Sequence, residues 1–194
     1  MKNTTGSRIV AVTAAIFVSM ALTGCENTDS VNAGANGVAW GKPMHLLSRV
    51  TAYRAGRGAS DKWSRKGQSA TGLPLRIAEP NKIGVAAAPS RFPSGSLLGV
   101  PTDDGPLFYL LADKGTDVES GKAAKIAGRT PAEKKAPVFD LCSHQQKWEN
   151  FKLVTLFPYR GSVPFEKLPL SQKVKVLTST ATHEVAVQMW RREQ

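Results

Sequence analysis

Two aspartates in apolar segments are the residues of this sequence best suited to acid–base chemistry. Asp113 ends the apolar run Leu107–Asp113 just before Gly115, and Asp140 lies inside a second short apolar run, Val138–Cys142. A carboxylate at the mouth of one buried strand and another within a second strand are costly to desolvate, unless a functional site uses them. We therefore predict that Asp113 and Asp140 form the site, provided that they meet in space.

The other reactive side chains indicate neither a metal centre nor a thiol nucleophile. His45, His144 and His183 are scattered, with no two at the spacing of a metal site, so we expect no metal and no cofactor. Cys142 follows Asp140 by two residues, which places both on one face of a continuing strand. No histidine can be paired with it from the sequence, and we expect a small buried residue.

The N-terminus has the pattern of a secretory signal. Lys2 and Arg8 precede an apolar run from Ile9 to Leu22, which is shorter than the roughly 20 residues of a membrane-spanning helix. The run ends in Leu-Thr-Gly-Cys25, which resembles the bacterial lipoprotein box. The resemblance implies that residues 1–24 are removed, that Cys25 is lipidated, and that Glu26 directs the protein to the periplasmic face of the outer membrane. The alternative is an ordinary secretory peptide that ends near a cysteine.

Composition favours one basic globular domain. The chain has 194 residues, 41% of them hydrophobic, and a formal net charge of +11. Loss of Lys2 and Arg8 with the signal leaves about +9, which favours polyanions such as phospholipid headgroups and anionic cell-wall polymers over nucleic acid at this location. A generally basic, solubilising surface is the alternative. With Cys25 assigned to lipid, Cys142 has no partner for an internal disulfide.

The remaining pattern predicts an all-β domain between two extensions. Residues 25–42 are small and polar, which predicts a flexible tether. Short strand-like runs between Gly and Pro turns predict a closed all-β or β-rich domain over residues 43–160, and these runs are 49–54, 83–88, 96–100, 107–111, 138–141 and 152–157. The Lys- and Ala-rich span 116–139 is expected to be a surface excursion. Alternation in residues 161–194 predicts a C-terminal β-hairpin that covers a barrel edge or pairs with a partner protein.

Five short motifs occur in one order, and together they resemble a known family. They are Val50–Tyr53, Ser69–Gly72 with Pro74, Val85–Pro89 with Phe92–Gly95, Ala112–Gly115, and Phe139–Leu141. This order is similar to the three-aspartate domain, the double-psi β-barrel module of membrane-bound lytic transglycosylase A, to which rare lipoprotein A and the expansins are related. The resemblance covers about Arg49 to Tyr159 and implies a six-stranded double-psi β-barrel.

The resemblance also implies cleavage of peptidoglycan glycan strands with formation of a 1,6-anhydro sugar. The family's catalytic acid/base falls on Asp140, and its neighbouring aspartate falls on Asp113. Protonating a glycosidic oxygen needs a carboxyl with a raised pKa, and one residue suffices as acid and then base because the sugar's own hydroxyl attacks. The expected substrate-binding residues are Thr71, Gly72, Gly115 and Trp63, the last as an exposed aromatic in a polar loop.

Three departures from the family keep a second hypothesis open. Ala88 occupies the position of the family's first aspartate, Asp113 and Asp140 lie 27 positions apart instead of in one compact loop, and the chain is too short for the second domain that forms a glycan groove. The first hypothesis is a murein lyase that uses Asp140 with Asp113. The second is a lipoprotein module on the same barrel that binds glycan or a partner protein without cutting.

Overall fold

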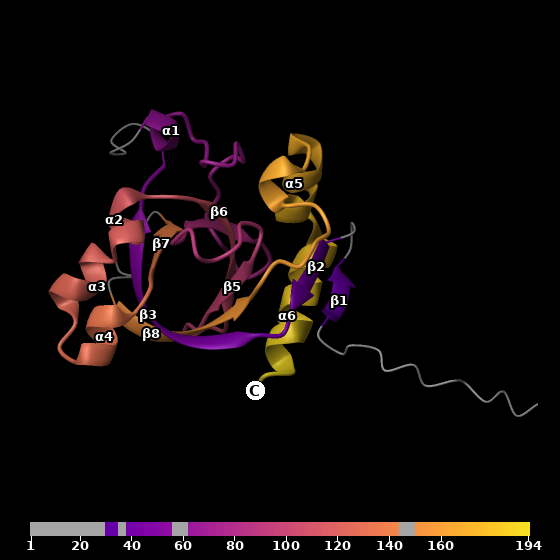
Figure 1. Ribbon diagram of the computed structural model, residues 1–194. Helices are drawn as coiled ribbons and strands as arrows, with labels where there is room; N and C mark the ends of the chain where they lie inside the picture. The colour runs from indigo at the N-terminus through magenta and orange to yellow at the C-terminus, as the bar shows by residue number, and fades with distance from the viewer. Residues whose placement is uncertain (1–29, 35–37, 56–61, 144–149) are drawn as a thin grey trace, which may run out of the picture.

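A closed six-stranded β-barrel forms the centre of the fold (Figure 1). The computed structural model describes residues 30–34, 38–55, 62–143 and 150–194. The barrel strands are β3 (Met44–Tyr53), β4 (Gly84–Ala87), β5 (Leu97–Val100), β6 (Leu107–Asp113), β7 (Val138–Cys142) and β8 (Asn150–Phe157). Their order is β3-β7-β4-β6-β5-β8, with β3–β7 and β4–β6 parallel and the other four pairs antiparallel. The prediction of an all-β barrel is confirmed.

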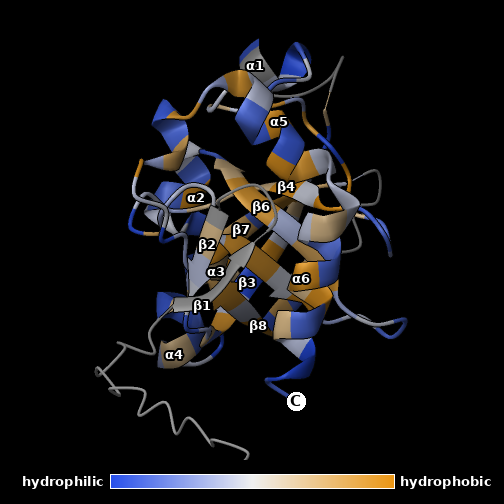
Figure 2. Cartoon of the chain, turned by 90° about the vertical axis from the view of Figure 1, so that its right-hand side faces the viewer, coloured by the Kyte–Doolittle hydropathy of each residue, from blue (hydrophilic) through white to orange (hydrophobic). Residues whose placement is uncertain are grey.

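Alternation along the strands separates the barrel interior from its outer wall. Val50, Tyr109, Phe139 and Val154 belong to one buried cluster that fills the interior. All four residues of β4 and of β5 are buried, because helices cover the outer wall there as well. In Figure 2 the barrel strands are accordingly mostly hydrophobic, whereas the outer helices carry both polar and apolar residues.

The C-terminal segment is helical, so the predicted β-hairpin over residues 161–194 is wrong. After a short 3-10 turn, η2 (Phe165–Lys167), the chain forms α5 (Leu170–Thr178) and α6 (Thr180–Arg191). The buried residues of α6 are Thr182, Ala186 and Met189, a spacing of four and three that places them on one helix face. This face joins the buried cluster on the outer wall of the barrel, and tertiary packing therefore overrides the alternation.

The predicted tether over residues 25–42 is wrong for its C-terminal part. β1 (Ser30–Gly34) and β2 (Val38–Gly41) form a two-stranded antiparallel sheet, and Trp40 is fully buried in the outer-wall cluster. The Trp40 indole Nε1 donates a 3.0 Å hydrogen bond to Gly95 O. Residues 1–29, including Cys25, lie outside the described residues. Within the described ranges, no helix has the length and apolar character needed to cross a membrane.

The excursion between Asp113 and Asp140 folds onto the outer wall of the barrel. It consists of three short helices, α2 (Thr116–Ser120), α3 (Lys122–Ala127) and α4 (Pro131–Lys135). Val118 of α2 and Ala124 of α3 pack with Ala87 of β4 and Val138 of β7. A capping box at Thr130 begins α4. A separate short helix, α1 (Lys62–Arg65), lies at the upper side of the molecule in Figures 1 and 2.

Candidate functional site

Strand register places Asp113 and Asp140 on either side of Ala87. Ala87 of β4 pairs with Asp113 across the parallel β4–β6 ladder and with Asp140 across the antiparallel β4–β7 ladder. Two strand spacings separate the two aspartate Cα atoms, which amounts to about 10 Å. β4 thus lies between the strands β6 and β7 that carry the two aspartates, and the intervening chain forms the excursion.

The two carboxylates share the outer face of the barrel wall. Residues directly opposite one another in a sheet point to the same side, and Ala87 packs outward against α2 and α3. An irregularity in the β4–β6 register skips Ala112, so that Asp113 and not Ala112 stands opposite Ala87. The helices α2 and α3 of the excursion therefore cover the barrel wall at Ala87, and Asp113 and Asp140 lie on either side of this covered position.

Asp113 is held by three hydrogen-bond donors. Its Oδ1 accepts from the backbone N–H of Ala70 at 2.7 Å and of Lys114 at 3.0 Å, and its Oδ2 accepts from the Tyr53 hydroxyl at 2.9 Å. Hydrogen bonds to a charged acceptor are the stronger kind. This carboxylate consequently ties β3, the loop that contains Ala70, and the end of β6 into one unit.

Asp140 is held by a hydroxyl from the neighbouring strand. The Thr51 Oγ1 donates a 2.7 Å hydrogen bond to Asp140 Oδ1, and the two residues are also backbone partners in the parallel β3–β7 ladder. Both side chains are half-buried. A short bond between directly opposed residues restricts the rotamer of the Asp140 side chain, as a positioned acid/base requires.

Tyr53 and Cys142 lie within the electrostatic reach of both carboxylates. Burial, with Asp113 as the next contributor, raises the pKa of Tyr53 far above its usual value, so its hydroxyl remains a donor. Burial likewise raises the pKa of Cys142 to about 11, and both Asp113 and Asp140 act in the same direction. Cys142 is 2% exposed. The burial that the sequence predicted for Cys142 is confirmed, and a buried thiol with a raised pKa is a poor nucleophile.

The four predicted substrate-binding residues lie on three segments, namely the loop before β4, the residue before α2, and α1. Thr71 docks on β6, because its N–H and its hydroxyl both donate to Ala112 O, the carbonyl of the residue skipped in the register. Gly72 has φ +82 in the turn that follows, where a side chain would be strained. Gly115 precedes α2 in an extended conformation. Trp63 lies in α1, and its side chain is outside the described part of the structure.

Ala88 is part of the core and not of the carboxylate face. It is 6% exposed in the barrel-interior cluster, and its N–H donates to Asp113 O at 3.2 Å.

No described group of three or more His, Cys, Asp or Glu side chains could hold a metal ion. His45 shares a 3.2 Å hydrogen bond with Thr155, His183 packs edge-on against Phe108, and His144 is outside the described residues.

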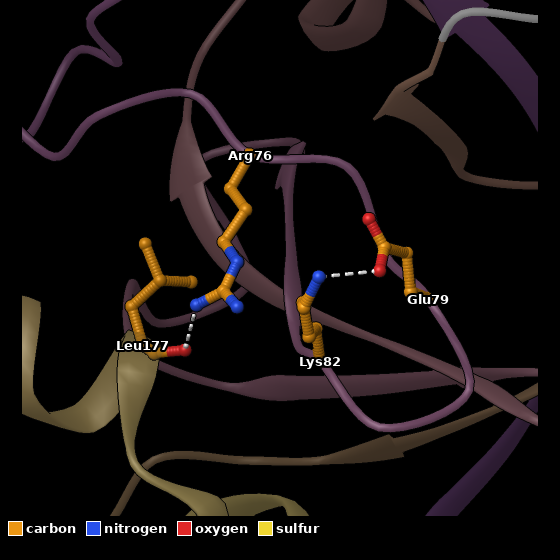
Figure 3. A network of polar contacts seen from close by, with 4 residues as sticks. All are labelled: Arg76, Glu79, Lys82 and Leu177. Carbon is orange, nitrogen blue, oxygen red and sulfur yellow. Dashed lines mark hydrogen bonds and ion pairs between the residues drawn. The ribbon is translucent and has the colours of Figure 1, made fainter.

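A cavity of about 370 Å³ lies at the opposite end of β6 from Asp113. Leu107, Trp190 and Arg191 are among its lining residues, together with Glu79. Figure 3 shows the contacts beside it: Lys82 Nζ binds Glu79 Oε2 at 2.6 Å, and Arg76 Nη1 donates to Leu177 O at 3.3 Å. The Arg76 bond joins this segment to the end of α5, and the Lys82–Glu79 pair lies within the segment itself.

Comparison of the chain with known protein families, with curated proteins and with solved structures found no match.

The sequence suggested Tyr53 as a sugar-stacking aromatic, but it did not predict that Thr51 and Tyr53 hydrogen-bond to the aspartates. The signal was present, because alternation along β3 places these two residues on one face, opposite Asp140 and Cys142 in the observed register. Only the parallel pairing of two strands far apart in the chain makes them neighbours. Tyr109 of β6, by contrast, is 1% exposed and belongs to the barrel-interior cluster, whereas Tyr53 hydrogen-bonds to Asp113.

Proposed function

We propose that this protein is a cell-envelope lipoprotein that acts on peptidoglycan glycan strands, with Asp140 as acid/base. The observation that carries the proposal is the placement of Asp140 and Asp113 on one face, on either side of Ala87, each held by hydrogen bonds. The closed barrel with parallel β3–β7 and β4–β6 pairs is compatible with a double-psi barrel, which supports the resemblance to the three-aspartate domain.

The two aspartates have different roles in this proposal. Both oxygens of Asp113 accept hydrogen bonds, two of them from backbone N–H groups, so Asp113 is the positioning residue. Asp140 donates its proton to the glycosidic oxygen as the bond to the anomeric carbon breaks. The resulting carboxylate then takes a proton from the sugar's own hydroxyl, whose oxygen bonds to the anomeric carbon and closes the anhydro ring.

The second candidate function is a module that binds glycan or a partner protein on the same face without cleaving. Two observations favour it. Ala88 is buried where the resembled family carries a third carboxylate, and α2 and α3 cover Ala87 between the two carboxylates that remain. Because catalysis on a long glycan needs an open cleft, a face that is partly covered favours binding over cleavage.

Incubation of the chain with purified sacculi separates these functions. The cleavage proposal predicts soluble anhydromuropeptides that accumulate with time, measured by liquid chromatography with mass spectrometry. Cosedimentation with sacculi and no product would instead support the binding module. Absence of both product and cosedimentation would refute each of these functions.

A further inference from the structure

The outer surface of the excursion is strongly basic. Residues 121–135 contain five cations, Lys122, Lys125, Arg129, Lys134 and Lys135, all exposed, against Glu133 as the one acid. Glu133 is held in the capping box, where backbone N–H groups lower its pKa. The Lys122 contact with Asp117 is a 4.0 Å pair between side chains that are mostly exposed, which contributes little. The cations are therefore available to an anionic partner.

Apolar side chains protrude beside these cations. Ile126, on the face of α3 opposite the buried Ala124, is 75% exposed. Leu47 and Leu153 are 41% and 61% exposed and stand opposite one another in the β3–β8 ladder. With Met44, they make four of the six large exposed hydrophobic residues in the described ranges, the others being Val163 and Leu170. α3 and α4 both contact β3, the strand that carries Leu47, and cations beside protruding aliphatic groups fit an interface with anionic lipid.

The chain outside the structure limits how far β1 can be from a membrane that holds an anchor at Cys25. Cys25 precedes Ser30, the first residue of β1, by five positions, a reach of at most about 18 Å. In Figures 1 and 2, β1 and α4 lie lower than α1 and α5, and Figure 1 shows β1 beside α6 on the right flank of the barrel and α4 on the left flank. An anchor at Cys25 keeps β1 near the bilayer and permits an orientation in which the lower side of the barrel, with α4 and its neighbour α3, faces the lipid.

We propose that the surface formed by α3, α4 and the Leu47–Leu153 pair docks on an anionic phospholipid bilayer. The inference rests on the lipid anchor at Cys25 that is part of the proposed function. Docking fixes the orientation of the barrel, so that the excursion beside Asp140 and Asp113 faces the lipid headgroups. A second hydrophobic and electrostatic contact adds to the membrane affinity that the acyl anchor supplies.

Site-specific fluorescence on the full, anchored chain tests the docking. A polarity-sensitive fluorophore is attached at Ile126→Cys, in the chain reconstituted into vesicles of phosphatidylcholine with phosphatidylglycerol, part of the lipid being brominated. The buried Cys142 is replaced by Ser in every sample, and the matched control carries the fluorophore at Leu170→Cys on α5. We expect quenching by brominated lipid at position 126 and none at position 170. Quenching at 126 is expected to be lost in vesicles of phosphatidylcholine alone and at high salt.

Charge reversal gives a second, independent readout. Lys134→Glu with Lys135→Glu should abolish the quenching at position 126, whereas Lys62→Glu with Arg65→Glu on α1 should leave it unchanged. Circular dichroism confirms that each variant is folded. Equal quenching at positions 126 and 170, or quenching at neither, would overturn the inference. A fluorescence change at 126 with purified sacculi and not with vesicles would overturn it in favour of a glycan-binding surface.

The same samples separate this inference from the proposed function. Failure of the chain to float with either kind of vesicle would overturn both the anchor and the docking. Flotation without quenching at 126 would overturn the docking alone. The absence of sacculus cleavage would leave the quenching result intact, because docking does not depend on Asp140.

Discussion

Replacing Tyr53 with Phe removes one hydrogen bond from Asp113 and leaves its other two in place. The Tyr53 hydroxyl donates to Asp113 Oδ2 at 2.9 Å, while Ala70 N and Lys114 N keep Oδ1. A hydrogen bond to a charged group contributes about 1.5–3 kcal/mol. Because Asp113 is half-buried and water replaces part of the lost bond, we expect Tyr53→Phe to lower the free energy of unfolding by about 1.5 kcal/mol. In a chain of this size, that loss lowers Tm by roughly 3–6 °C.

Tyr109→Phe is the matched control. Its ring is buried in the barrel interior, and no hydrogen bond links its hydroxyl to any other described residue. We expect this variant to change the free energy of unfolding by less than about 0.5 kcal/mol. Urea denaturation at neutral pH, followed by tryptophan fluorescence, measures both variants. Equal losses in the two variants would show that the Tyr53 hydroxyl does not act through Asp113.

A double-mutant cycle assigns the loss to the Tyr53–Asp113 pair. Combining Tyr53→Phe with Asp113→Ala should cost less than the sum of the two single changes, with a coupling of about 1 kcal/mol. The same cycle between Tyr109→Phe and Asp113→Ala should give additive losses. A Tyr53–Asp113 coupling of zero would refute the role given to Asp113 as the residue that joins β3 to β6.

Three further predictions concern the thiol, the C-terminal helices and the excursion. Burial raises the pKa of Cys142 to about 11 from 9, so the folded protein keeps a proton that the unfolded chain loses. The free energy of unfolding should therefore fall by about 2–3 kcal/mol as pH rises through this window, and Cys142→Ala should flatten that slope in urea titrations. Gly99→Ala places a Cβ 2.5 Å from the Trp190 ring, which should cost about 1–3 kcal/mol by thermal denaturation, less in a Trp190→Ala background. Thr130→Ala removes the capping box and should destabilise α4 by about 1 kcal/mol, seen as faster amide exchange.

Each of these has an outcome that would contradict it. An unchanged alkaline slope in Cys142→Ala would mean that the thiol is not buried beside the carboxylates. If Trp190→Ala gave no relief to Gly99→Ala, α6 would not pack on β5 as described. Unchanged amide exchange in Thr130→Ala would mean that the capping box does not stabilise α4.

The barrel itself could be predicted because each strand carries its own local signal. Runs such as Leu107–Asp113 and Val138–Cys142 are apolar, bounded by turn residues, and of strand length, and both were predicted within a residue or two. The closed barrel followed from the number of such runs. What local patterns do not contain is which strands are neighbours, and hence the placement of Ala87 between Asp113 and Asp140.

The errors lie where tertiary packing decides between local alternatives. The stretch around Lys173–Leu177 alternates and also fits a helix, and burial of Val176 and Leu177 against the barrel favours the helix. In the predicted tether, burial of the Trp40 indole orders a segment whose other residues are mostly small and polar. Trp40 packs in the outer-wall cluster, and its Nε1 donates a hydrogen bond to Gly95 O. Neither effect can be predicted from the local sequence, because each depends on the barrel surface against which the side chain packs.

The most direct test of the central claim is the rate at which Asp140→Asn releases anhydromuropeptides from purified sacculi, compared with the unsubstituted chain. Asn keeps an oxygen acceptor for Thr51 but cannot exchange a proton, so the fold is expected to persist. Asp117→Asn, an exposed change on α2, is the matched control. We predict a loss of about 10²–10⁴-fold in Asp140→Asn and an unchanged rate in Asp117→Asn. Release by Asp140→Asn at the unsubstituted rate would contradict the assignment of Asp140 as the acid/base.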